Sequence, residues 1–162
     1  MKSIIYIGED NQVLEQIKST EGITLNHCSN ALIFVHLLES EGAHFDLIIV
    51  ERRLTGMNGE ESFIKVRNFI MEKHIPFILI DDYFTQEDRS RFIRIGVHDI
   101  YRRPLHFESV LSRLNFWKEM RDFKETHAQI PIAKYEYRPI SFGKRLFDIV
   151  FSSLALLFYH PY

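Results

Sequence analysis

Short apolar runs alternate with longer segments of helical periodicity from the N-terminus to about residue 125. A short apolar run between polar residues is typical of a buried strand, whereas apolar residues three and four positions apart are typical of an amphipathic helix. The pattern predicts strands at 4–7, 23–28, 45–50, 76–80 and 97–101. It predicts helices with apolar residues at 13–17, 31–38 and 63–70, a fourth helix opening at 85–88, and a last helix over 107–126.

The alternation of strands with helices predicts an α/β fold. Parallel strands need crossover connections, so five strand–helix pairs with short links imply a five-stranded parallel sheet with helices on both faces. In such folds the functional crevice lies at the carboxyl ends of the strands. The polar residues expected there are Glu9, Asp10, Glu51, Asp81, Asp82 and Arg103. A simpler interpretation, in which these residues only end strands and face water, stays open.

Composition narrows the classes of partner and ligand. The net charge is −2 and the basic residues form no run longer than a pair, which argues against nucleic acid as the main partner. The single cysteine, Cys28, excludes an intramolecular disulfide and indicates a reducing compartment. The eight histidines never stand at metal-ligand spacing with a second ligand set, so we expect no zinc site.

The segment 51–59, Glu-Arg-Arg-Leu-Thr-Gly-Met-Asn-Gly, resembles the stretch of response-regulator receiver domains in which an aspartate precedes a Pro-Gly-Met-Asp-Gly loop. Three further positions match the family's spacing. Gly8 to Asp10 fall where the family has its acidic pair, Asp81 where it has a hydroxyl residue, and Arg103-Pro104 where it has Lys-Pro. The resemblance covers residues 1–126. It implies a flavodoxin-like, CheY-like (βα)5 fold and a cis bond before Pro104.

The same positions depart from the family's chemistry. In a working receiver an aspartate attacks the phosphodonor, while Mg²⁺, a lysine and a hydroxyl hold the phosphoryl oxygens. Here Glu51 displaces the nucleophilic oxygen by a methylene, and in-line transfer tolerates little displacement. Gly8 replaces the first acid of the pair, and Asp81, in place of the hydroxyl residue, cannot donate a hydrogen bond when ionised. Arg103 replaces the compact ammonium group of the lysine with a planar guanidinium group. We therefore predict a pseudo-receiver with no catalytic residue.

Together these substitutions predict a site whose charges are built in. We expect Glu9, Glu51, Asp81 and Arg103 to form a permanent ionic cluster. In it Glu51 would extend outward, to where the charge of a phosphoryl group would sit, and Arg103 would bind one or two carboxylates. Weak Mg²⁺ binding by Glu9, Asp10 and Glu51 stays open, because hard cations favour carboxylates. We expect no other cofactor.

The pattern changes after the last helix. Residues 127–143 indicate an extended linker, and 144–162 resemble the start of bacterial sugar transferases that move a hexose-1-phosphate onto a polyprenyl phosphate. The apolar run 146–159 is shorter than the roughly 20 residues that a spanning helix needs. A buried or amphipathic C-terminal helix is the alternative. The resemblance places these residues at the membrane interface: Lys144, Arg145, Phe147, Asp148 and Pro161.

Our functional hypothesis combines the two segments. The chain would be a phosphorylation-independent, receiver-like regulatory or assembly domain attached to a phosphoglycosyl transferase of surface-polysaccharide synthesis. It would lie at the cytoplasmic face of the bacterial inner membrane and bind the membrane surface through 144–162. Its partner would be a second copy of the chain or the transferase domain, whose catalytic residues would lie beyond residue 162. The alternative is a stand-alone single-domain response regulator in a two-component phosphorelay.

Overall fold

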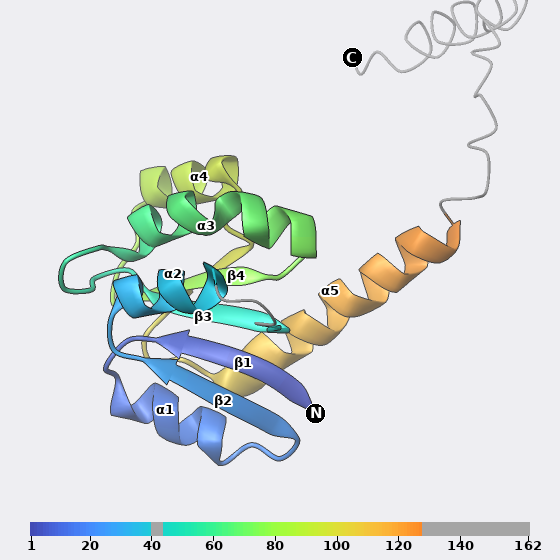
Figure 1. Ribbon diagram of the computed structural model, residues 1–162, viewed down its shortest axis with the longest axis horizontal. Coiled ribbons are helices and arrows are strands. Elements are labelled where there is room, and N and C mark those ends of the chain that lie inside the picture. The colour runs from blue at the N-terminus through green and yellow to red at the C-terminus, as the bar shows by residue number, and fades with distance from the viewer. Residues whose placement is uncertain (40–43, 128–162) are drawn as a thin grey trace, which may run out of the picture. The chain divides into compact units, whose positions relative to one another are not determined.

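A computed structural model describes residues 1–39 and 44–127 of the chain. Five strands alternate with five helices in this part of the chain, as Figure 1 shows. In chain order the elements are β1 Lys2–Ile7, α1 Asn11–Lys18, β2 Ile23–Cys28, α2 Ala31–Glu39, β3 Leu47–Glu51, α3 Gly59–Lys73, β4 Phe77–Asp81, α4 Gln86–Ile95, β5 Asp99–Arg102 and α5 Phe107–His127.

The strands form one parallel sheet in the order β2-β1-β3-β4-β5. Helices α1 and α5 cover one face of the sheet, and α2, α3 and α4 cover the other (Figure 1). The predicted α/β fold with five parallel strands is confirmed. Because the order reverses between β1 and β3, the crevice of a doubly wound sheet opens at the carboxyl ends of these two strands. Glu51 ends β3 at this point, beside the loop that follows β1.

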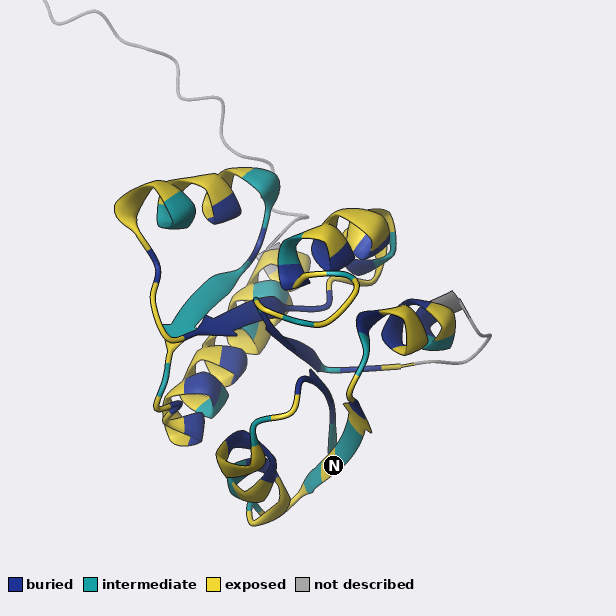
Figure 2. Ribbon diagram, turned by 90° about the vertical axis from the view of Figure 1, so that its left-hand side faces the viewer, coloured by how far each residue is buried: buried dark blue, intermediate teal, exposed yellow. Residues whose placement is uncertain are grey.

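Alternate strand residues point to opposite faces, so the core has two layers. On the α2–α4 side, Ile5, Ile48 and Leu79 pack with helix residues such as Phe63. On the α1–α5 side, Tyr6, Ile49 and Ile78 pack with helix residues such as Val110. Figure 2 shows the resulting pattern, with buried residues on the sides of the helices that face the sheet. The central strands are buried on both faces because helices cover both.

The helices start close to the carboxyl edge of the sheet, and capping side chains determine the residue at which α1, α3 and α4 begin. Asp10 caps α1 by accepting hydrogen bonds from the backbone N–H groups of Gln12 and Val13. A capping box of Asn58 and Glu61 opens α3. A second capping box, of Thr85 and Asp88, opens α4. Each box satisfies backbone donors that the first turn would leave unpaired.

The fifth strand starts later than the sequence predicts, at Asp99 in place of Val97. Gly96 ends α4 in the left-handed conformation, and the N–H of Val97 donates to the Phe92 carbonyl oxygen at 3.0 Å. Val97 is therefore part of the C-terminal cap of α4, where it is buried without pairing as strand. A buried apolar residue in a cap gives the same local signal as one in a strand.

In the described residues no helix is both long and apolar enough to cross a membrane. Met1–Arg121 form one compact unit, and the predicted domain boundary at residue 126 stays a prediction. The predicted linker beyond His127 and the segment 144–162 lie outside the described residues, and with them Lys144, Arg145, Phe147, Asp148 and Pro161.

Adjacent residues of α3 test the assignment of its buried face. Phe63 is fully buried and meets the Phe77 ring edge-on, whereas the side chain of Ile64 is 58 % exposed. We expect Phe63→Ala to lower the free energy of unfolding by about 3–5 kcal/mol, because it leaves a core cavity. Ile64→Ala should change it by about 0.5 kcal/mol or less. Urea unfolding measures both values. A comparable loss in the two variants would contradict the packing described here.

Candidate functional site

The carboxylate of Glu51 is the centre of the first polar cluster. Only 8 % of the residue is exposed, and its Oε1 atom accepts hydrogen bonds from several donors at once. The backbone N–H groups of Asp10 and Glu9 donate at 3.0 and 3.2 Å, and the Tyr6 hydroxyl also donates. Nη2 of Arg103 lies 3.0 Å from the same oxygen. A buried carboxylate is stable only with such partners, and here it has four.

The side chain of Glu51 reaches these donors by folding back over Gly8. A Cβ atom at Gly8 would lie 2.5 Å from each of three Glu51 atoms, Cγ, Cδ and Oε1. Glu51 therefore fills the space that a side chain at position 8 would need. The prediction that Glu51 extends outward was wrong, because the backbone amides after β1 and the Tyr6 hydroxyl attract its charge inward.

Arg103 joins three carboxylates with its three guanidinium nitrogens. Nε lies 2.7 Å from Asp10 Oδ2, Nη2 lies 3.0 Å from Glu51, and Nη1 lies 3.2 Å from Asp82 Oδ1. Burial alone would lower the pKa of Arg103, but Glu51, Asp10 and Asp82 raise this pKa above its ordinary value. The Arg103–Pro104 peptide bond is cis, as the resemblance implies. Arg103 is thus a permanent cation fixed between the ends of β1 and β3.

Tyr6 is a site residue that the sequence analysis missed. It lies in β1, is fully buried, and also accepts a hydrogen bond from the Asp10 N–H at 3.1 Å. Burial, and next its hydrogen bond to Glu51, raise the pKa of Tyr6 far above its ordinary value. Its hydroxyl therefore keeps the proton that it donates to Glu51. The signal in the sequence was a single hydroxyl group within the aliphatic run of β1.

The carboxylate of Asp81 belongs to a second cluster. Asp81 and Arg103 meet only through the backbone, where the Arg103 N–H donates to the Asp81 carbonyl oxygen at 3.1 Å, while the Arg103 guanidinium binds other carboxylates. Asp81 ends β4, is 1 % exposed, and lies 3.5 Å from Arg52 Nη1 and 3.4 Å from Arg53 Nε. Its Oδ1 accepts the backbone N–H of Asp82, while its Oδ2 accepts no hydrogen bond from any described residue. Glu9 contributes its backbone N–H to Glu51, and its side chain is exposed. The four residues expected in one cluster are therefore divided.

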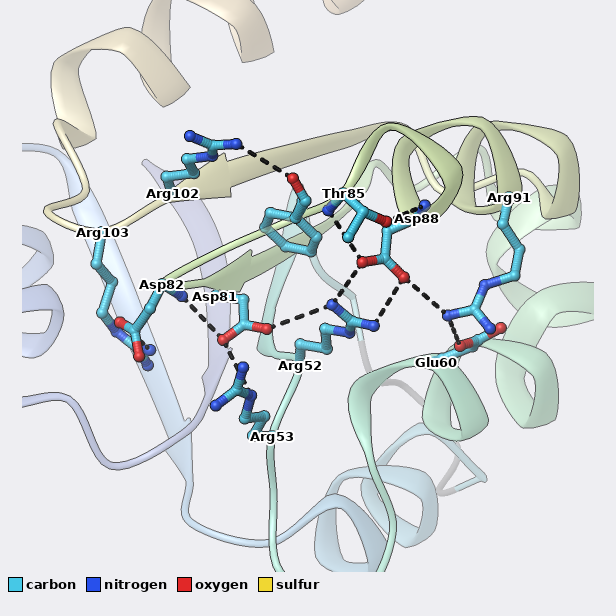
Figure 3. Close-up of polar contacts among 11 residues, drawn as sticks. Arg52, Arg53, Glu60, Asp81, Asp82, Thr85, Asp88, Arg91, Arg102 and Arg103 are labelled. Carbon is cyan, nitrogen blue, oxygen red and sulfur yellow. Dashed lines mark hydrogen bonds and ion pairs between the residues drawn. The ribbon is translucent and has the colours of Figure 1, made fainter.

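Arg52 extends the second cluster to the start of α4, as Figure 3 shows. Its guanidinium donates to both carboxylate oxygens of Asp88, at 2.8 and 3.1 Å, and lies 5.6 and 5.3 Å from the ring centres of Phe84 and Phe92. The contact between Arg52 and Asp88 connects the end of β3 to the first turn of α4. Arg91 also contacts Asp88, at 3.3 Å, and extends this ion-pair network to a neighbouring helix.

The ion-pair network ends at Glu60 in the first turn of α3, whose carboxylate lies 2.8 Å from Arg91 Nη2. Burial alone would raise the pKa of Asp88, but hydrogen bonds from Thr85 and Arg52 lower this pKa below its usual value. Asp88 therefore stays ionised at neutral pH, where it caps α4 and binds two arginines. A shallow depression of about 410 Å³ lies over this network, lined by Arg52, Arg53, Asn58, Glu60 and Arg91.

The described residues do not fit a magnesium ion. Of the three acids proposed as ligands, Asp10 and Glu51 are both paired with the cation Arg103, and the side chain of Glu9 is exposed. Within 1–39 and 44–127, no group of three or more His, Cys, Asp or Glu side chains is arranged to hold a metal ion. What the arrangement does is fix the loop after β1 to the ends of β3 and β5.

Among curated proteins, the chain is similar to the sensor histidine kinase CheAY of Helicobacter pylori, with 25 % identity over 95 residues. The match covers 59 % of this chain and 12 % of that kinase, so the chain spans only a small part of the curated relative that it matches. No protein-family model matches the chain.

Solved structures give a closer likeness in shape than in sequence. The receiver domain of a Francisella response regulator has a TM-score of 0.63 at 14 % identity, covering 75 % of this chain and 99 % of that one. A response regulator receiver domain from Clostridium thermocellum gives 0.65 at 13 %, covering 76 % and 98 %. The receiver domain of a Pseudomonas aeruginosa sensor histidine kinase, solved with magnesium in its active site cleft, gives 0.60 at 18 %, covering 72 % and 96 %. The chain therefore contains a domain of the receiver fold.

Proposed function

We propose that this receiver-fold domain is a regulatory or assembly domain that works without phosphorylation. The observation that carries the proposal is the state of Glu51, which stands at the phosphoacceptor position. Its carboxylate is paired with Arg103, and its Oε1 atom is occupied by hydrogen-bond donors. The charge that a kinase would add to a working receiver is replaced by fixed charges of the chain itself.

The geometry of Glu51 opposes attack on a phosphodonor. An attacking oxygen needs a free lone pair aligned with the phosphorus atom. All four contacts of the Glu51 carboxylate go to Oε1. A movement of the side chain that brings the carboxylate to a phosphodonor would therefore break the contacts with two backbone amides, the Tyr6 hydroxyl and Arg103. Each charged hydrogen bond lost would cost about 1.5–3 kcal/mol. Asp81, buried where receivers have a hydroxyl, would repel the incoming phosphoryl group.

The second cluster supports a single conformation. Arg52 connects Asp81 at the end of β4 with Asp88 in the first turn of α4, and Arg91 carries the connection to α3. A bidentate arginine that also lies near two aromatic rings is a geometrically demanding contact. Moving α4 would break it. The surface around α4 is therefore suited to a partner that binds one permanent shape.

A phosphorylation assay tests this proposal directly. We expect the full chain, incubated with acetyl phosphate and MgCl₂, to show no labile adduct of about 80 Da by intact mass spectrometry. A working receiver domain in the same tube serves as the positive control. A labile adduct on the wild type that disappears in Glu51→Gln would contradict the proposal. That result would favour the second candidate, a response regulator still controlled by a kinase, which the likeness to a sensor histidine kinase supports.

We further propose that the domain is attached to a membrane phosphoglycosyl transferase of surface-polysaccharide synthesis. What supports this is the sequence of 144–162 alone, where Lys144-Arg145 precede the apolar run 146–159 and His160-Pro161 follow it. Paired cations suit lipid headgroups and an apolar run of this length suits one leaflet. The proposed location is the cytoplasmic face of the bacterial inner membrane.

Vesicle sedimentation tests the proposed membrane segment. The full chain should pellet with vesicles of phosphatidylglycerol and phosphatidylethanolamine, because the segment supplies both positive charge and apolar area. A chain ending at residue 139 should stay in the supernatant. Lys144→Glu combined with Arg145→Glu, which keeps the length and the apolar run, should bind more weakly than the wild type. If the full chain stays in the supernatant, the membrane proposal is wrong.

A further inference from the structure

We propose that Gly8 is a positioning residue for Glu51, so that positions 8 and 51 form a compensating pair. Only one of the two positions can send a side chain into the space above the end of β1. Glu51 occupies that space, and the missing Cβ of Gly8 makes room for it. Gly8 would then determine where the central charge of the site lies, although it carries no functional group.

The space between Gly8 and the Glu51 side chain is too small for a methyl group. The 2.5 Å that would separate a Gly8 Cβ from Glu51 Cγ, Cδ and Oε1 is far inside van der Waals contact. The clash is with the middle of the Glu51 side chain as well as with its end. A small rotation of the carboxylate would therefore not relieve it, and the whole side chain would have to leave.

The backbone of Gly8 cannot easily move away instead. Its N–H donates to the Cys28 carbonyl oxygen at 3.1 Å, and its own carbonyl oxygen lies 2.8 Å from Nε2 of His27. The His27 ring in turn stacks on Tyr6, with ring centres 5.8 Å apart. These contacts hold Gly8 against β2. The clash with a side chain added at position 8 would therefore be relieved by displacing the Glu51 side chain.

Displacing Glu51 has an electrostatic consequence beyond the loss of packing. The carboxylate would lose the amides of Glu9 and Asp10 and the Tyr6 hydroxyl. Arg103 would keep Asp10 and Asp82 but lose its contact with the most buried of its three carboxylates. Gly8 therefore acts on the arginine through Glu51, and its effect should disappear when Glu51 has no side chain beyond Cβ.

A double-mutant cycle in the full chain tests this dependence. Gly8→Ala should lower the melting temperature by about 5–10 °C, as overpacking of a buried position does. In the Glu51→Ala background the same substitution should lower it far less, because Cγ, Cδ and Oε1 are gone. Any backbone strain of alanine at the Gly8 φ of +159° lowers the melting temperature in both backgrounds, so it cancels in the comparison. Glu51→Gln keeps the side-chain length, so it should give no relief.

Gly59 offers a matched control. A Cβ there would lie 2.7 Å from the Glu51 backbone oxygen and 2.7 Å from Leu79 Cδ2, and so would clash with groups that Glu51→Ala retains. Gly59→Ala should therefore lower the melting temperature equally in both backgrounds. Equal penalties for Gly8→Ala in both backgrounds would overturn the proposal.

Amide NMR separates positioning from a merely structural role. In the wild type the Glu9 and Asp10 N–H protons should resonate downfield, because they donate to a carboxylate. Gly8→Ala should move both upfield, as Glu51→Ala does, and should add nothing in the double variant. If Gly8→Ala does not fold alone, recovery of folding in the double variant supports the proposal, and failure of both overturns it. The role of Glu51 in the site rests on the proposed function, but its placement by Gly8 does not. Neither the melting temperatures nor the amide shifts involve phosphate, so the two proposals can fail separately.

Discussion

The contact between the buried Glu51 carboxylate and Arg103 is the interaction on which the rest of the site depends. A carboxylate 8 % exposed would be costly without a cation and hydrogen-bond donors around it. The chain supplies both from separate elements: Tyr6 from β1, the amides that follow it, and Arg103 from beyond β5. Gly8 leaves the space in which they meet. The Tyr6 hydroxyl, the two backbone amides and the space at Gly8 thus all stabilise the ion pair of Glu51 and Arg103.

The same principle extends along the carboxyl edge of the sheet. Each of the six acids of the two clusters has an arginine nitrogen within 3.5 Å. Arg103 pairs with Asp10, Glu51 and Asp82. The other arginines, Arg52, Arg53 and Arg91, pair with Asp81, Asp88 and Glu60. The arginines thus surround six of the acids at this edge with fixed positive charge. These ion pairs hold the loops and the start of α4 in one arrangement.

The sequence predicted the fold well because strand and helix periods are local signals. The order of elements, the parallel sheet and the position of Glu51 at its crevice all follow from these signals. The direction of the Glu51 side chain did not, because it depends on space left by Gly8 and on donors 41 and 42 residues away. Tyr6 was missed because an aromatic residue in a buried strand normally indicates packing. The Asp81 carboxylate pairs with Arg52 and Arg53 and not with the Arg103 guanidinium, and no local pattern specifies which arginine an acid will meet.

The central claim is that Glu51 already has its partners and accepts no phosphoryl group. Beryllofluoride with Mg²⁺ tests this most directly, because it binds a receptive carboxylate in the geometry of a phosphoryl group. Amide and arginine side-chain ¹H–¹⁵N NMR spectra of the full chain should be the same with and without beryllofluoride and Mg²⁺. Saturable shifts at Glu9, Asp10, Arg103 and the first turn of α4, absent from Glu51→Gln, would contradict the account.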